Sequence, residues 1–130
     1  MIAEAVALIA IVTPMQHSEP PGRLEIDGVA RAASCQTRAC KKRVANKRKA
    51  TVVAPYRSRF ERIAQCESGG RWYISTGNGF FGGLQFTYSS WKAVGGWGYP
   101  HWNSKLEQMY RGVLLMRIQG WGAWPVCSQM

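Results

Sequence analysis

Residues 56–86 read YRSRFERIAQCESGGRWYISTGNGFFGGLQF, and this stretch predicts a helix followed by a small β-hairpin. Apolar residues of its first part follow the i, i+3, i+4 spacing of one helix face: Phe60, Ile63 and Ala64. The pattern predicts an amphipathic helix over 56–67, ended by the two glycines after Ser68. Two short runs rich in rings or branched side chains, 72–75 and 80–86, flank a Gly-Asn-Gly turn and predict the hairpin.

The remaining C-terminal sequence predicts two more helices. Thr87 can cap a short helix that runs through Val94, and Asn103 can cap the longest helix, which Gly120 ends. The apolar face expected for the long helix comprises Leu106, Met109, Tyr110, Val113, Leu114 and Ile118. The predicted class is therefore α+β, with helices around a short β-hairpin.

Composition divides the 130 residues into three parts. All aromatic residues lie at or beyond Tyr56, which places the hydrophobic core in residues 56–130. Residues 1–13 form a short apolar segment, and residues 14–55 form a Pro/Gly-punctuated connector followed by a basic helical arm. We therefore expect one globular domain with an N-terminal extension, and this distribution excludes two globular domains of equal size.

The apolar N-terminal segment is too short to cross a bilayer as a helix, which takes about 20 residues. It also differs from a secretory signal, because it has no basic residue before the apolar run, carries Glu4 and lacks a small-residue cleavage site before Pro14. We expect a short helix that packs on a partner or on the body of the protein, and no transmembrane span.

Basic residues outnumber acidic ones by 17 to 7, and residues 31–50 contain eight Lys or Arg residues and no acid. Such a charge attracts polyanions, among them nucleic acid, anionic lipid and the anionic polymers of a bacterial wall. Because no aromatic residue lies among these cations, the stacking platform of single-strand binders is missing, which argues against nucleic acid. Two interpretations stay open: a solvated linker, or an electrostatic anchor to a polyanion, among which anionic wall polymers are candidates.

Four cysteines in a chain this short predict two disulfides and an oxidising or extracellular setting. Of the three connectivities, the simplest pairs Cys35 with Cys40 and Cys66 with Cys127. We expect no metal site, because no Cys-x2-Cys occurs and neither histidine lies at a ligand spacing from the cysteines. The absence of phosphate-loop and dinucleotide motifs likewise predicts no cofactor.

Three side-chain carboxylates occur in residues 56–130, and Glu67 is the candidate catalytic acid among them. Glu61 lies beside basic residues on the polar side of its helix, and Glu107 forms an i, i+4 pair with Arg111. Glu67 lies at a helix C-terminus, where the helix dipole and desolvation would both raise its pKa. A protonated carboxyl there can act as the general acid of glycoside cleavage; the alternative is an exposed helix-end residue without catalytic function.

Ordered motifs over residues 58–128 resemble the resuscitation-promoting-factor catalytic domain. The motifs are Ala64-Gln65-Cys66-Glu67-Ser68-Gly69-Gly70, Trp72, Thr76-Gly77-Asn78-Gly79, Gly82-Gly83-Leu84-Gln85-Phe86, Ser90-Trp91 and Gln119-Gly120-Trp121-Gly122-Ala123-Trp124-Pro125-Val126-Cys127. This resemblance implies a lysozyme-like fold and cleavage of the glycan of peptidoglycan. It also implies that Glu67 is the catalytic acid and that Cys66 and Cys127 form the structural disulfide.

The same resemblance implies which residues bind the substrate. Gln85 would donate or accept hydrogen bonds with sugar groups, and Thr76 and Asn78 in the hairpin turn are further candidates. Trp91 would be a stacking surface for the apolar face of a sugar.

A single acid favours the chemistry of a lytic transglycosylase, because no second cleft carboxylate is available. The glutamate would protonate the oxygen between N-acetylmuramic acid (MurNAc) and N-acetylglucosamine (GlcNAc), then take the proton from the muramyl C6 hydroxyl. Hydrolysis of this linkage by a muramidase is one alternative, and a noncatalytic peptidoglycan-binding or virion structural module is another. Residues 1–55 lie outside the resemblance. A nonpolar start, a Cys-x4-Cys basic segment and a terminal muralytic domain are together similar to phage-encoded actinobacterial wall-degrading proteins, so we expect a setting at the extracellular wall or in a virion, with tail components among the partners.

Overall fold

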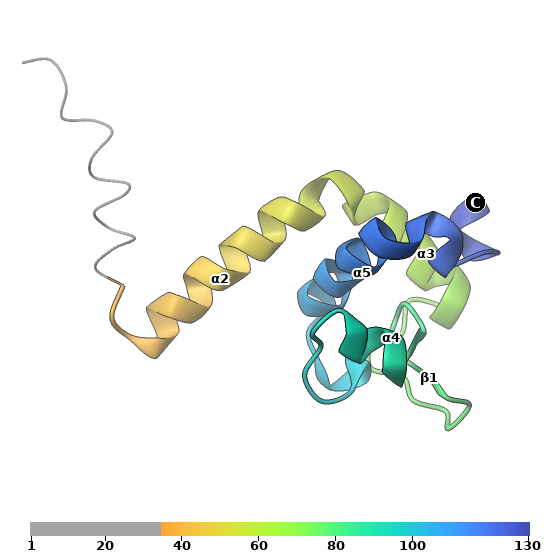
Figure 1. The fold of residues 1–130 in the computed structure, drawn as a ribbon, viewed down its shortest axis with the longest axis horizontal. Helices are drawn as coiled ribbons and strands as arrows, with labels where there is room; N and C mark the ends of the chain where they lie inside the picture. The colour runs from red at the N-terminus through yellow and green to blue at the C-terminus, as the bar shows by residue number, and fades with distance from the viewer. Residues whose placement is uncertain (1–34) are drawn as a thin grey trace, which may run out of the picture. The chain divides into compact units, whose positions relative to one another are not determined.

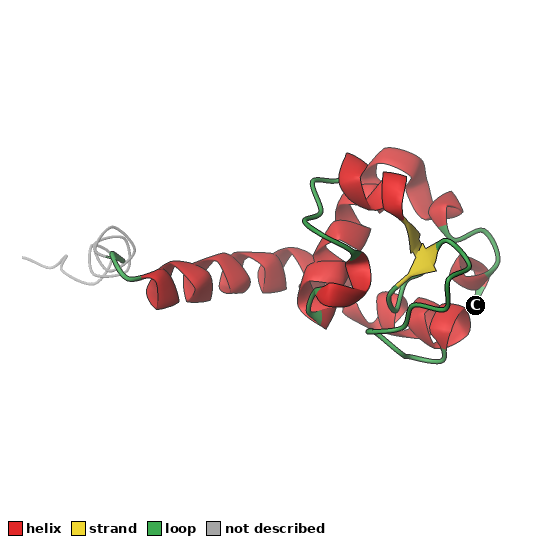
Figure 2. Ribbon diagram, turned by 90° about the horizontal axis from the view of Figure 1, so that it is seen from below, coloured by secondary structure: helices red, strands yellow, loops and turns green. Residues whose placement is uncertain are grey.

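Four α-helices, four 3-10 helices and one two-stranded sheet make up residues 35–130, the part of the chain that this computed structural model describes. Their order is α2 (Arg38–Val53), η1 (Ala54–Tyr56), α3 (Arg57–Ser68), β1 (Phe80–Phe81), β2 (Phe86–Thr87), α4 (Tyr88–Ala93), η2 (Pro100–Trp102), α5 (Lys105–Gln119), η3 (Gly120–Ala123) and η4 (Cys127–Gln129) (Figure 1). Helices surround the small sheet (Figure 2), which confirms the predicted α+β class. The predicted apolar segment 1–13 lies outside the described residues.

Helix α2 is part of the same compact unit as the helices that follow it. Its last residue, Val53, is fully buried in the core, and α2 packs along α5. The Lys49 ammonium forms an ion pair with Glu107 of α5. The boundary predicted before residue 56 therefore separates no structural units, because the end of the basic arm contributes to the core.

Helix α3 confirms the helix predicted from the apolar spacing and the two glycines. Its buried face comprises Phe60, Ile63, Ala64 and Ser68. Gly69 adopts the left-handed conformation, with φ of 63°, which glycine enters without steric cost. The amides of Gly69 and Gly70 donate to the carbonyls of Gln65 and Ala64, each at 3.0 Å. The helix therefore stops one residue after Glu67.

The sheet differs from the predicted hairpin in the position of its turn. Strand β1 pairs antiparallel with β2, and the connecting turn is Gly82–Gln85, inside the run that the sequence predicts as one strand. The predicted pairing across residues 76–79 is reduced to a single bridge between Ser75 and Phe81. A Cβ at Gly83 would lie 2.6 Å from the ring of Trp72, so close packing on this ring requires glycine at the turn.

The helix caps agree with the sequence at α4 and differ by one residue at α5. The Thr87 hydroxyl accepts the Ser90 amide at 3.1 Å, as predicted. Helix α5 is capped by Ser104 rather than by Asn103. Asn103 instead donates its side-chain amide to the carbonyls of Trp97 and Tyr99, which fixes the loop before the helix.

The core gathers around α5 and the aromatic residues of α3, β2, α4 and the C-terminal tail. Its largest fully buried side chains include Trp91, Phe60, Phe86, Ile63, Leu84, Met109 and Gln108. The predicted apolar face of α5 is correct at Met109 and Val113, whereas Ile118 in the last turn is exposed. Within the described residues, no helix combines the length and the apolar character needed to span a membrane.

Candidate active site

Glu67 lies half-buried in the last turn of α3. Burial raises the pKa of Glu67 above its ordinary value of 4.5, because desolvation penalises the carboxylate form. Among residues 35–130 no cation forms a salt bridge with Glu67. The side chain therefore retains its proton to a higher pH than an exposed glutamate does, as a general acid requires.

The other two side-chain carboxylates of this region are held in ion pairs between helices. Glu61 accepts a hydrogen bond from Lys105 at 2.8 Å, and this bond and the Lys105 charge lower the pKa of Glu61. Glu107 pairs with Lys49 and, at 2.8 Å, with the Arg111 Nε. Within residues 35–130, no group of three or more His, Cys, Asp or Glu side chains is placed to hold a metal ion.

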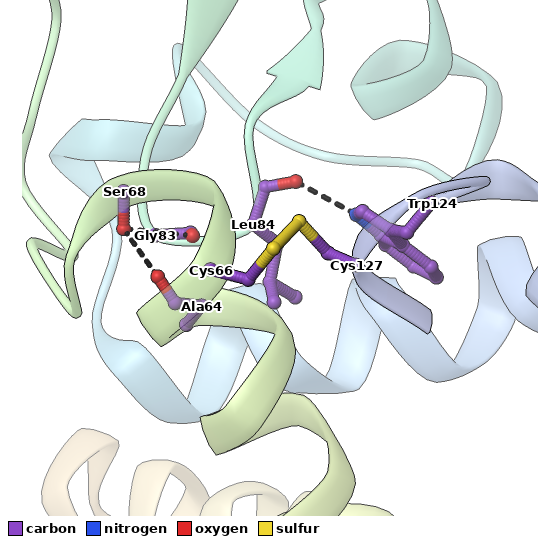
Figure 3. The surroundings of a disulfide bond; sticks show 7 residues. All are labelled: Ala64, Cys66, Ser68, Gly83, Leu84, Trp124 and Cys127. Atoms are coloured by element: carbon purple, nitrogen blue, oxygen red, sulfur yellow. Dashed lines mark hydrogen bonds between the residues drawn. A yellow bond between two sulfur atoms is a disulfide. The ribbon is translucent and has the colours of Figure 1, made fainter. Parts of the chain in front are cut away.

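Hydrogen bonds join the turn Gly82–Gln85 to the end of α3 and to the C-terminal tail (Figure 3). The Ser68 hydroxyl lies 2.9 Å from the carbonyl oxygens of both Ala64 and Gly83. The indole N–H of Trp124 donates to the Leu84 carbonyl at 2.8 Å. These contacts tie the turn to the end of α3 that carries Glu67 and to the C-terminal tail.

A disulfide holds the same end of α3. Cys66, the neighbour of Glu67, is bonded to Cys127 at the start of η4, 61 positions later in the chain (Figure 3). Cys35 and Cys40 form the second disulfide. Both predicted pairings are confirmed, and the first of them fixes the backbone next to the candidate acid.

Gln108 is a buried polar residue of the site that the sequence analysis missed. Its side chain is fully buried, and its Oε1 accepts the Gly83 amide at 2.9 Å. Its Nε2 donates to the carbonyls of Trp72 at 2.8 Å and Asn103 at 3.0 Å. A Cβ at Gly82 would lie 2.3 Å from this Oε1. The available signal was a polar residue on the core-facing side of an apolar helix.

Gln85 lines a hollow of about 400 Å³ between the sheet, α4 and the C-terminal part of α5. The polar side chains that line it are Gln85, Thr87, Ser89, Ser90 and Gln119, and its ring side chains are Phe80, Phe86 and Trp124. Gln85 is the one described non-glycine residue with positive φ, at 50°. Its Nε2 donates to the Gly82 carbonyl at 2.9 Å, which leaves the Oε1 without a partner among the described residues.

Thr76 and Asn78 lie on the exposed loop between Ser75 and β1, outside the lining of this hollow. The Asn78 Oδ1 accepts the Phe80 amide at 3.1 Å and so fixes the local turn. The structure therefore brings Gln85 to the hollow and leaves these two candidates at the surface.

Trp91 is a core residue, and the prediction that it forms a stacking surface is wrong. Its side chain is 0% exposed and packs edge-on against Phe86, with ring centroids 5.2 Å apart. A Cβ at Gly96 would lie 2.2 Å from the Trp91 ring, so the following loop covers it closely. The indole rings that do face solvent are Trp97, 78% exposed, and Trp102, 63% exposed.

A comparison with known protein families identifies the part of the chain that carries the candidate active site. The sequence profile described as "Transglycosylase-like domain" matches residues 54–127. The chain belongs to the transglycosylase-like domain family. Helix α2 lies outside the match, although it packs on the transglycosylase-like domain.

Relatives of this transglycosylase-like domain include three resuscitation-promoting factors. The factor Rpf of Micrococcus luteus is 64% identical over 70 residues, which cover 54% of this chain and 31% of the relative. Rpf1 of Corynebacterium glutamicum is 46% identical over 87 residues, covering 61% and 45%. RpfE of Mycobacterium tuberculosis is 47% identical over 78 residues, covering 60% and 45%. The chain thus spans less than half the length of these relatives.

Proposed function

We propose that this chain cleaves the glycan strand of bacterial peptidoglycan between MurNAc and GlcNAc, as a lytic transglycosylase with Glu67 as its acid and base. One observation carries the proposal: Glu67 is half-buried with a raised pKa, while Glu61 and Glu107 are held in salt bridges. The family match and the identity to resuscitation-promoting factors support the same class of chemistry.

The proposed reaction needs one carboxyl group and no water. The protonated Glu67 donates its proton to the bridging oxygen, the bond from muramyl C1 to this oxygen breaks, and GlcNAc leaves with a free 4-hydroxyl. The Glu67 carboxylate then takes the proton of the muramyl C6 hydroxyl, whose oxygen bonds to C1. The product is a 1,6-anhydromuramyl end, and Glu67 is again protonated.

The hollow beside the turn supplies groups that suit a polar, hydroxylated polymer. Hydroxyls of Thr87, Ser89 and Ser90 and the amides of Gln85 and Gln119 can bond sugar hydroxyl and acetamido groups, while Phe80 offers an apolar face. Gln85 is held in a left-handed conformation that costs about 1 kcal/mol or more in a non-glycine residue. We propose Gln85 as the principal sugar-binding side chain. Thr76 and Asn78 would contact the part of the glycan strand that extends outside the hollow.

The decisive experiment is mass spectrometry of soluble fragments from purified actinobacterial peptidoglycan. The full chain and its Glu67→Gln variant are incubated in parallel, and Glu61→Gln serves as the matched control because Glu61 lies exposed on the same helix. We expect muropeptides one water lighter than reducing ends from the chain and from Glu61→Gln, and none from Glu67→Gln.

Two other results would change the assignment. Reducing ends that depend on Glu67 would retain the site and make the enzyme a muramidase. No fragments from the unmodified chain, together with sedimentation of the chain with peptidoglycan, would refute the enzyme and favour a noncatalytic binding module.

A further inference from the structure

Helix α2 carries a dense group of cations that form no salt bridge within residues 35–130. Six exposed basic side chains of α2 form no salt bridge with any described residue, and we call them the α2 basic surface: Arg38, Lys41, Lys42, Arg43, Lys47 and Arg48. The helix contains no acidic residue. At a rise of about 1.5 Å per residue, these charges lie within about 15 Å of helix.

This concentration of positive charge destabilises helix α2. Pairs such as Arg38 with Lys42 and Arg43 with Lys47 lie four residues apart, where like charges repel. Cations in the first turn also oppose the helix dipole, and that turn contains no acid. The Thr37 hydroxyl, which accepts the Cys40 amide at 3.1 Å, holds the helix start against these effects. A bound polyanion would remove both unfavourable terms.

The α2 basic surface is also fixed relative to the candidate active site. The C-terminal half of α2 packs on α5, and Val53 lies in the core, whereas the N-terminal half extends away from the other helices of the unit (Figures 1 and 2). At 3.6 residues per turn, Arg43 and Lys47 lie on the side of the helix opposite to Arg38 and Lys42. The cations therefore lie around the helix instead of lining one face, and four of the six lie on its projecting N-terminal half: Arg38, Lys41, Lys42 and Arg43.

We propose that the α2 basic surface binds a phosphodiester-linked anionic polymer of the bacterial wall, so that the transglycosylase-like domain is held beside its substrate; the choice of partner rests on the proposed function. Phosphate suits this surface because one guanidinium group can donate two parallel hydrogen bonds to the oxygens of one phosphate. A nucleic acid fits less well. A groove reader presents its contacts on one helix face, and residues 35–55 offer no aromatic ring on which bases could stack.

The test measures binding of a fluorescent poly(glycerol phosphate) teichoic acid to the full chain carrying Glu67→Gln, which keeps the α2 basic surface and removes the proposed acid. Two further variants of this chain each remove three exposed charges: Arg43→Gln/Lys47→Gln/Arg48→Gln on α2, and Arg62→Gln/Lys92→Gln/Arg117→Gln elsewhere. Glutamine retains helix propensity, and circular dichroism verifies folding. Affinity is measured over 50–200 mM salt, with duplex DNA at equal phosphate concentration as the competing ligand.

We expect the α2 variant to lose at least tenfold in affinity at 100 mM salt, and the control variant less than threefold. The slope of log K against log salt should become shallower by about 2 for three lost cations. Equal losses in both variants would overturn the proposal in favour of general charge attraction, and tighter binding of DNA would overturn it in favour of nucleic acid.

A separate assay distinguishes this inference from the proposed function. On peptidoglycan stripped of its anionic polymers, the α2 variant with Glu67 intact should release fragments at the rate of the unmodified chain. Polymer binding through α2 without any fragment release would refute the proposed function and would support the inference about the α2 basic surface. Release of fragments without α2-dependent binding would refute this inference alone.

Discussion

Replacing Gln108 by leucine should destabilise the domain by about 5 kcal/mol. The substitution keeps the volume of the side chain and removes three hydrogen bonds, to the Gly83 amide and to the carbonyls of Trp72 and Asn103. A buried group left without a partner costs about 1–3 kcal/mol. The Gly83 amide lies in the interior, so it should incur the upper part of this range, whereas the two carbonyls are partly exposed and should incur the lower part.

The assay is urea denaturation followed by tryptophan fluorescence, with Gln129→Leu as the matched control. Gln129 is exposed in the last 3-10 helix, so its replacement should change the free energy of unfolding by no more than about 0.5 kcal/mol. Hydrogen exchange adds a local measurement, because the Gly83 amide should lose protection in Gln108→Leu. A destabilisation below about 1 kcal/mol, or an unchanged Gly83 exchange rate, would refute the role of Gln108 in holding the turn.

Three further outcomes are expected. Because burial raises the pKa of Glu67, the native state binds this proton more tightly than the unfolded state, and stability falls as pH rises from the ordinary 4.5 through the raised value. Glu67→Gln should therefore have a higher free energy of unfolding than the unmodified chain at pH 7 and an equal one at pH 3; no difference at pH 7 would contradict the burial argument. Replacing both Cys66 and Cys127 by serine opens a loop of 61 positions and should lower the free energy of unfolding, measured by urea denaturation, by about 4 kcal/mol. A decrease of less than about 1 kcal/mol would contradict a stabilising role of this disulfide. Trp91→Ala should cost about 3–5 kcal/mol and Trp97→Ala under about 0.5 kcal/mol, since one ring is buried and the other exposed; similar losses would show that the assigned burial is wrong.

Local sequence signals were sufficient for the presence of the helices, for the end of α3 and for the start of α4. The glycine at position 69 ends α3 because its left-handed conformation is set by the residue itself, and Thr87 caps α4 through its own hydroxyl. The disulfides followed from chain position, since one pair is local and the other brackets the aromatic region. The choice of Glu67 over the other two glutamates also came from the sequence, because those two have basic neighbours, and its catalytic role stays a prediction.

Contacts between distant residues decided the features that the sequence analysis missed. Glycine-rich turns occur at residues 76–79 and 82–85, and the sheet forms across the second because Trp72 and Gln108 pack against its glycines. Whether a tryptophan lies inside or outside depends on partners far along the chain, which is why Trp91 was assigned to the surface. Asn103 and Ser104 are both good caps, and the loop carbonyls that bind Asn103 decided between them.

The end of α3 also explains why Glu67 forms no salt bridge within residues 35–130, although basic residues outnumber acidic ones there. Arg71 is four residues after Glu67, the spacing at which a helical arginine would pair with it. The left-handed Gly69 ends the helix first, and the Arg71 Nε instead donates to the Ser68 carbonyl at 2.8 Å. Arg59, on the same helix, stacks 3.9 Å from the Trp121 ring centroid and donates to a tail carbonyl. Because both cations are bound elsewhere, neither offsets the desolvation that raises the pKa of Glu67, and the left-handed Gly69 thereby helps this carboxyl keep its proton to a higher pH than an exposed glutamate does.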